Sequence, residues 1–101
     1  LDGVPLAKKS TAEEAPLFIL RPNPNRGTFA FRVQEIPGME PEEEVSLEIY
    51  SASGQLVHQE HYRGCLPYME YPVHMQDPVS GLYYARFRCG TRVEMLKVLV
   101  E

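Results

Sequence analysis

The stretch Ser80–Glu101, SGLYYARFRCGTRVEMLKVLVE, decides the fold. It contains two runs rich in strand-forming residues, Leu82–Phe87 and Val93–Val100, which are separated by the short polar break Arg88–Arg92 with its central glycine. Strand formers on both sides of a glycine-containing break are typical of an antiparallel hairpin. The second run stays apolar almost to the last residue, and chain ends fray unless a sheet holds them. We therefore expect this hairpin either to complete a core or to be recognised by a partner.

The last predicted strand is apolar on both of its faces. Side chains alternate between the two faces of a strand, which here places Val93, Met95 and Leu99 on one face and Leu96, Val98 and Val100 on the other. A strand that covers a core with one face needs only one apolar set. The other set is either covered within the domain or offered to a partner.

The remaining sequence is organised as short strands between turns. Alternating or continuous apolar runs predict five more strands, at Leu17–Leu20, Thr28–Val33, Val45–Tyr50, Gln55–Tyr62 and Tyr71–Met75. Gly27 and Gly54 are expected to provide left-handed turn conformations. No segment has convincing helical periodicity, so the fold class we predict is all-β: a seven-stranded antiparallel immunoglobulin-like β-sandwich over residues 16–101. Residues 1–15 are expected to be a linker or arm from an upstream protein.

Composition and charge argue against nucleic-acid binding. The chain of 101 residues has 44% hydrophobic and 24% charged residues, which are values for a globular domain, and its formal net charge is −4. The ten Lys and Arg residues are scattered along the sequence, whereas binding to phosphate backbones needs a concentrated basic face. We therefore expect no nucleic-acid partner.

The sequence offers no active site, metal site or cofactor motif. His58 and His61 are three positions apart on a predicted strand and so point to opposite faces, while His74 lies on the polar side of its own strand. The acidic loop Pro37–Glu44 lacks the glycine and spacing of a calcium loop, and a solvated loop is the simpler interpretation. We expect a non-enzymatic module without metal or cofactor.

The two cysteines leave two interpretations open. Cys65 and Cys89 do not form a C-x-x-C motif, which removes the support for zinc or redox chemistry. They are either two separate buried thiols or, in an exported protein, a disulfide that joins the loop after Tyr62 to the last hairpin. The sequence does not fix the distance between their Cα atoms, on which a disulfide depends.

Four stretches, taken in order, resemble one family. They are PNPNRGTF at Pro22–Phe29, VSLEIYSASGQLV at Val45–Val57, SGLYYARF at Ser80–Phe87 and KVLV at Lys97–Val100. Together they are similar to the type A C-terminal sorting domain of the type IX (Por) secretion system of Bacteroidetes. The resemblance covers about residues 17–101. It implies a seven-stranded sandwich, in agreement with the strands predicted from the alternation.

The resemblance also implies a function, which is to direct a folded cargo protein across the outer membrane. The implied partners are the translocon and an outer-membrane shuttle barrel, followed by a cell-surface sortase that removes the domain, with cleavage expected within residues 7–16. The protein would be exported, through the periplasm, to the outer-membrane surface or the medium. Motif matching assigns the signal to Gly81 and Tyr83, and to Lys97, Val98, Leu99 and Val100.

Two further hypotheses remain. The family tail often ends in a basic residue, whereas this chain ends in Glu101. The alternative to a removed signal is therefore a retained immunoglobulin-like docking or adhesion module of a surface protein or of the secretion machinery. Because edge strands tend to pair with other chains, we also consider self-association through the last strand or the N-terminal arm. Since the chain begins with Leu1, we expect it to be part of a longer protein.

Overall fold

The computed structural model describes residues 17–34 and 44–101 and contains seven strands there. They are β1 (Phe18–Arg21), β2 (Thr28–Val33), β3 (Val45–Ser51), β4 (Leu56–Tyr62), β5 (Glu70–His74), β6 (Gly81–Cys89) and β7 (Arg92–Val100). The prediction of an all-β, seven-stranded antiparallel sandwich is confirmed. The predicted linker, its cleavage region and the acidic loop apart from Glu44 lie outside the described residues.

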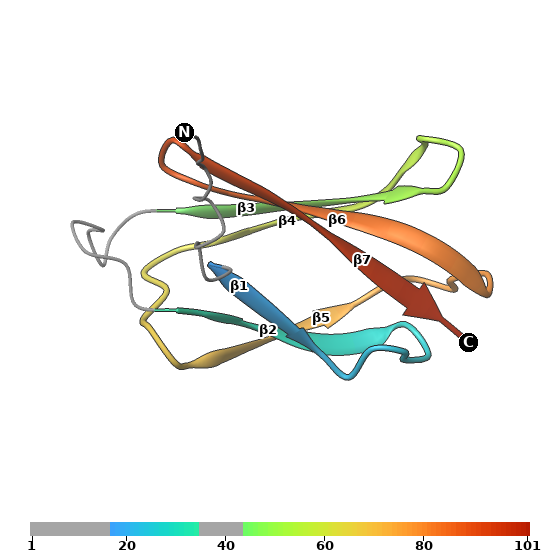
Figure 1. Ribbon diagram of the computed structural model, residues 1–101, viewed down its shortest axis with the longest axis horizontal. Helices are drawn as coiled ribbons and strands as arrows, with labels where there is room; N and C mark the ends of the chain where they lie inside the picture. Colours follow the sequence, from blue (N-terminus) through green and yellow to red (C-terminus); the bar gives the residue numbers. More distant parts are fainter. Residues whose placement is uncertain (1–16, 35–43) are drawn as a thin grey trace, which may run out of the picture.

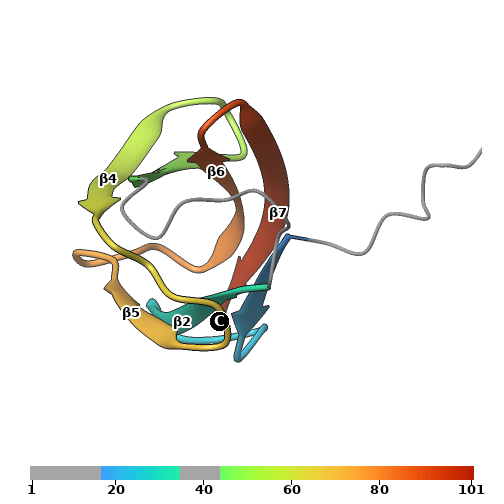
Figure 2. The same ribbon diagram turned by 90° about the vertical axis from the view of Figure 1, so that its left-hand side faces the viewer.

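The strands form two sheets that face each other across the core. One sheet has the order β1-β2-β5 and the other the order β4-β3-β6-β7, and all pairings within them are antiparallel. Figure 1 shows the two layers, with β7 crossing diagonally from the larger sheet towards the smaller one. In the end view of Figure 2 the strands surround the core, and β7 lies beside β1. The two edge strands β7 and β1 therefore meet on one side of the sandwich.

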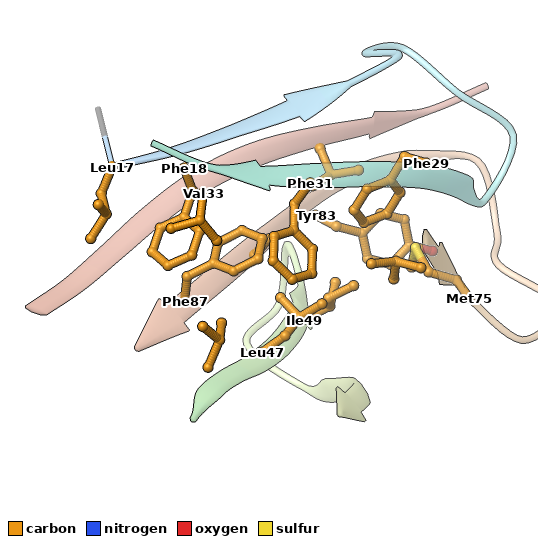
Figure 3. Packing of buried hydrophobic residues seen from close by; sticks show 14 of the residues in the cluster. Leu17, Phe18, Phe29, Phe31, Val33, Leu47, Ile49, Met75, Tyr83 and Phe87 are labelled. Atoms are coloured by element: carbon orange, nitrogen blue, oxygen red, sulfur yellow. The ribbon is translucent and has the colours of Figure 1, made fainter. Parts of the chain in front are cut away.

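The core is built from the inward side chains of both sheets. The alternation in β2 buries Phe29, Phe31 and Val33, while the alternation in β3 buries Val45, Leu47 and Ile49. Figure 3 shows the aromatic centre of this core, where the ring of Phe18 stacks on that of Phe87 with centroids 4.5 Å apart. Phe31 lies 5.0 Å from Phe87 and bridges the two sheets. This central contact explains why a chain without tryptophan has a continuous core.

The turns account for the differences between predicted and observed strand ends. The polar break at Arg88–Arg92 is shorter than predicted, because Arg88 and Cys89 belong to β6 and Arg92 belongs to β7. Only Gly90 and Thr91 form the turn, and Gly90 has φ 61°, the conformation of the first central residue of a type II′ hairpin turn. This turn matches the twist of the flanking strands, so pairing continues up to Cys89 and Arg92. Positive φ values at Gly27 and Gly54 confirm those two predictions.

The two cysteines are present as buried thiols at one end of the sandwich, and the disulfide interpretation is not supported. Cys89 lies opposite Val45, which in turn lies opposite Tyr62, and Cys65 follows Tyr62 in the next loop. Burial disfavours the thiolate and raises the pKa of Cys65 to about 11, with a smaller contribution from the neighbouring Cys89. Cys65 therefore belongs to the apolar core and is a protonated thiol at neutral pH.

Candidate recognition site at the C-terminal strand

Strand β7 presents two different faces. Its inward face buries Val98 and Val100, which belong to the core cluster. Its outward face exposes Val93, Met95 and Leu99, with 56% of Met95 and 45% of Leu99 accessible to solvent. The predicted division of the strand into two apolar sets is thereby confirmed. Within residues 17–34 and 44–101, no strand covers the outward set.

The six residues assigned to the signal divide between the core and the surface. Tyr83, Val98 and Val100 are buried, and the Tyr83 hydroxyl donates to the Val79 carbonyl over 2.6 Å. Lys97 and Leu99 are exposed on the outward face of β7. Three of the six residues therefore pack in the core beneath the hairpin. The side chains of Lys97 and Leu99 are accessible to a partner.

Gly81, the sixth of these residues, begins β6 opposite Val100. Its φ of 151° lies in the region that favours glycine. A methyl group added at its Cα would meet nothing within 4 Å, so the conformation of the backbone, rather than close packing, favours glycine here. Gly81 is therefore a residue that sets the start of the hairpin, next to the end of the C-terminal strand.

The outward face of the hairpin continues from β7 onto β6. The register places Leu82 opposite Leu99, Tyr84 opposite Lys97 and Arg86 opposite Met95. Directly opposite residues in an antiparallel pair share one face of the sheet. Tyr83 and Tyr84 consequently point to opposite faces, one into the core and the other outward, as predicted. We call the set formed by Leu82, Tyr84, Met95, Lys97 and Leu99 the outer hairpin face.

The hairpin is positively charged in an otherwise acidic chain. Residues 81–100 contain four basic side chains and a single acidic one, whereas the whole chain has a formal net charge of −4. The acidic residue, Glu94, accepts hydrogen bonds from the backbone amides of Leu17 at 2.6 Å and Phe18 at 3.1 Å. Its carboxylate is therefore directed at β1 and not at the cations of the hairpin. The surface combines exposed apolar side chains with an excess of positive charge.

The segment Pro22–Gly27 lies along the outer edge of β7. Asn25 pairs with the end of β7 as an isolated parallel bridge, with its amide donating to the Leu99 carbonyl over 2.9 Å. The side chain of Asn23 donates to the Lys97 carbonyl and accepts from the Leu99 amide, at 2.8 and 2.9 Å. The first family motif thus contacts the last one directly, although they are more than 70 residues apart in the sequence.

A polar network occupies the same outer side of the sheet, closer to β3 and β4. The Glu48 carboxylate accepts from the Tyr50 hydroxyl and from the Arg86 guanidinium, both at 2.9 Å. The Tyr50 hydrogen bond, followed by that of Arg86, lowers the pKa of Glu48, and the bond to Glu48 raises the pKa of Tyr50. Beside this network is a pocket of about 190 Å³ lined by Ser46, Glu48, Gln59, His61, Arg86 and Arg88. Its lining contains two guanidinium groups, those of Arg86 and Arg88, and one carboxylate, that of Glu48, so the excess of positive charge on the hairpin continues into this pocket.

The histidines do not converge on a common site. His58 is largely buried and contacts Glu60 at 3.0 Å, while the exposed His61 contacts Glu44 at 2.7 Å. His74 lies on the other sheet, where it contacts the Thr28 hydroxyl. Within the described part of the chain, no cluster of three or more His, Cys, Asp or Glu side chains is arranged to hold a metal ion. The same part has no helix that is long and apolar enough to cross a membrane.

A comparison with protein families identifies the family of the chain. The sequence model of the secretion system C-terminal sorting domain matches residues 20–101, which is most of the chain. The chain belongs to this family. The sorting domain is a C-terminal signal for type IX secretion, so the protein that carries it is exported, and the family is not an enzyme family. A search of curated proteins found no match.

The sequence alone does not reveal part of the candidate site of this sorting domain. Pro22–Phe29 is one of the four family motifs, but nothing in its local pattern indicates that Asn23 and Asn25 reach the last strand. Glu94 appears in the sequence as an ordinary exposed charge between apolar residues. The pairing of Leu82 with Leu99 follows from the hairpin register and was the one feature that a careful count from the Gly90–Thr91 turn could have found.

Proposed function

We propose that the sorting domain is recognised by an outer-membrane shuttle barrel and the translocon of the type IX system through the outer hairpin face. The observation that carries this proposal is the division of β7, whose inward side chains complete the core while Leu99 and Met95 remain exposed beside Lys97. Single exposed apolar residues are common, but a row of them on an ordered strand is typical of a protein interface. The domain acts as a sorting signal in its folded state, and not as an unfolded tail.

The later steps belong to the same proposal. The cargo passes through the periplasm to the outer-membrane surface, where a sortase cleaves within residues 7–16 and removes the domain. Support comes from the composition of this segment, since its small and polar residues suit proteolysis when exposed. The intact mass of the mature protein tests this step directly. A mass that lacks the domain is the expected result, and a mass that includes it would favour a retained docking module.

The test of recognition must change the surface without disturbing the core. Deleting residues 96–101 would remove Val98 and Val100 from the core, so a loss of export would have two explanations. The double variant K97E/L99D instead changes two exposed side chains of β7. In full-length cargo expressed in cells with the type IX system, we expect this variant to remain inside the cell while the domain keeps its native circular dichroism spectrum.

The matched control is Val79→Asp, which places an acidic residue at another exposed apolar position, 75% accessible and outside the outer hairpin face. Normal export of this control together with retention of K97E/L99D supports the proposal. Normal export of K97E/L99D would remove the outer hairpin face from the mechanism of sorting.

A further inference from the structure

The outer edge of β7 is closed over its last residues by the chain itself. Residues 97, 99 and 101 direct their backbone groups away from β6, and four hydrogen bonds satisfy groups of this edge. Two are backbone bonds, from the Asn25 amide to the Leu99 carbonyl and from the Glu101 amide to the Asn25 carbonyl, at 2.9 and 2.8 Å. The other two use the side chain of Asn23, whose amide group takes the place of a peptide unit.

The segment that closes the edge is itself held rigidly. Asn25 is the one buried polar residue in the described ranges, with 5% of its surface accessible. Its side chain accepts from the Gly27 amide at 2.8 Å and donates to the Pro22 carbonyl at 3.0 Å, which fixes the turn around it. The Met75 amide donates to the Gly27 carbonyl at 2.8 Å and joins the turn to the end of β5 in the three-stranded sheet. We call Asn23 and Asn25, with these bonds, the edge clasp.

The edge clasp determines how a partner can bind the end of β7. An ordinary edge strand presents unpaired amides and carbonyls to which another strand adds, and those new backbone bonds supply the affinity. At residues 97–101 a partner strand would first have to break the four bonds of the clasp and would then form a similar number. Strand addition therefore gains no surplus of hydrogen bonds at this position.

The side chains of the same residues remain accessible. Leu99 and Leu82 are opposite each other on the outer hairpin face, and Lys97 lies next to them and forms no ion pair with the described residues. A partner that complements this group has an apolar pocket for the two leucines and a carboxylate for the ammonium group. The excess of basic residues in the hairpin favours such an acidic partner surface.

We propose that the edge clasp keeps the C-terminal strand closed, and that a partner with an acidic, apolar pocket reads it from the outer hairpin face and not by strand addition. The proposal deepens the proposed function and rests on it for the identity of the partner that binds the strand. The closed edge is a property of the folded chain alone and does not depend on any partner. The two parts are therefore tested by different measurements.

Hydrogen exchange of backbone amides in the 101-residue chain tests the closed edge. In Asn23→Ala the Leu99 amide loses its acceptor, so we expect it to exchange about tenfold faster, the factor that one hydrogen bond of typical net strength provides. The core amides of Phe31 and Leu47 keep their protection. Arg26→Ala, an exposed residue of the same segment, is the matched control and leaves the Leu99 amide protected.

Two results of this experiment would overturn the closed edge. One is a Leu99 amide that exchanges in the wild-type chain as fast as in an unfolded peptide. The other is a Leu99 amide with equal protection in the wild type and in Asn23→Ala. If Asn23→Ala exposes the core amides as well, the wild-type chain decides the question. A Leu99 amide that is protected there upholds the closed edge, and one that exchanges at the rate of an unfolded peptide overturns it.

Export of the full-length cargo tests how the partner binds. If the partner binds the outer hairpin face of the closed strand, Asn23→Ala lowers export because this face is no longer held in position. Arg26→Ala is then exported normally. Export of Asn23→Ala at or above the wild-type level would overturn the proposal, since strand addition benefits from an open edge. In that case, failure of K97E/L99D to be exported would still uphold the proposed function. Normal export of K97E/L99D would refute the proposed function and leave the exchange result standing.

Discussion

Glu94 connects the two sheets at the edge where β1 meets β7, and removal of its carboxylate is expected to lower the free energy of unfolding. Its carboxylate accepts from the amides of Leu17 and Phe18, two residues whose own surfaces are only 3% and 1% accessible. In Glu94→Ala these amides lose their acceptor at a place that water reaches poorly. An unsatisfied buried amide costs about 1–3 kcal/mol. Because the end of β1 can shift slightly towards solvent, we expect a total loss of about 2–4 kcal/mol in the free energy of unfolding.

The assay is equilibrium unfolding in urea, followed by circular dichroism because the chain contains no tryptophan. The midpoint concentration is expected to fall with an unchanged m-value, and the melting temperature to fall by roughly 10–20 °C. Glu94→Gln keeps an acceptor oxygen but loses the charge, so its loss is expected to be about half as large. Both variants keep the same core.

The matched control is Glu70→Ala. This variant also removes a carboxylate with a partner, because Glu70 lies 3.1 Å from the Arg21 guanidinium. The pair is exposed, however, with 63% of the Arg21 side chain and 49% of the Glu70 side chain accessible. Exposed ion pairs of this kind contribute about 0–1 kcal/mol. If Glu94→Ala and Glu70→Ala have the same free energy of unfolding within about 0.5 kcal/mol, the inference that Glu94 ties the sheets together is wrong.

Two more predictions concern a turn and a thiol. Gly27→Ala is expected to destabilise the domain by about 2–4 kcal/mol, because Gly27 has φ 104° and an added Cβ would lie 2.5 Å from the Pro78 ring. Gly54→Ala, with φ 93° and no atom within 4 Å, isolates the backbone strain and is expected to lose only about 1–2 kcal/mol; equal losses in urea unfolding would contradict the steric argument. Cys65 stays protonated in the fold while an unfolded thiol ionises near pH 9, so its contribution to stability is complete below about pH 9 and is lost as the pH rises to about 11. Iodoacetamide at pH 8 should modify it far more slowly in the native chain than in urea, as peptide mass spectrometry can show, and equal rates would show that it is not buried.

The sequence predicted the parts of the fold that depend on local pattern. Strict alternation in Phe29–Val33 and Val45–Ile49 is enough to define a strand with one buried face, because a shift by one residue would expose the whole apolar set. Gly27 and Gly54 marked turns for the same local reason, since few other residues adopt a positive φ. The strand order and the pairing of the edges depend on contacts between distant residues and were not predictable in this way.

The candidate recognition site shows this limit clearly. The apolar pattern of β7 indicated two faces, but it gave no reason to choose Val98 and Val100 for the core and Leu99 for the surface. That choice follows from the register with β6, which a two-residue turn at Gly90 and Thr91 fixes. The roles of Asn23 and Glu94 require partners 74 to 77 residues away, so no local rule reveals them.

The central claim is that this folded domain is a sorting signal read through its outer hairpin face. The most direct measurement is the amount of a periplasmic reporter that reaches the cell surface when the 101-residue chain is joined to its C-terminus in cells with the type IX system. The account predicts surface delivery with the wild-type chain and retention in the periplasm with K97E/L99D, both chains being folded. Delivery of the reporter by both chains, or by neither, would contradict it.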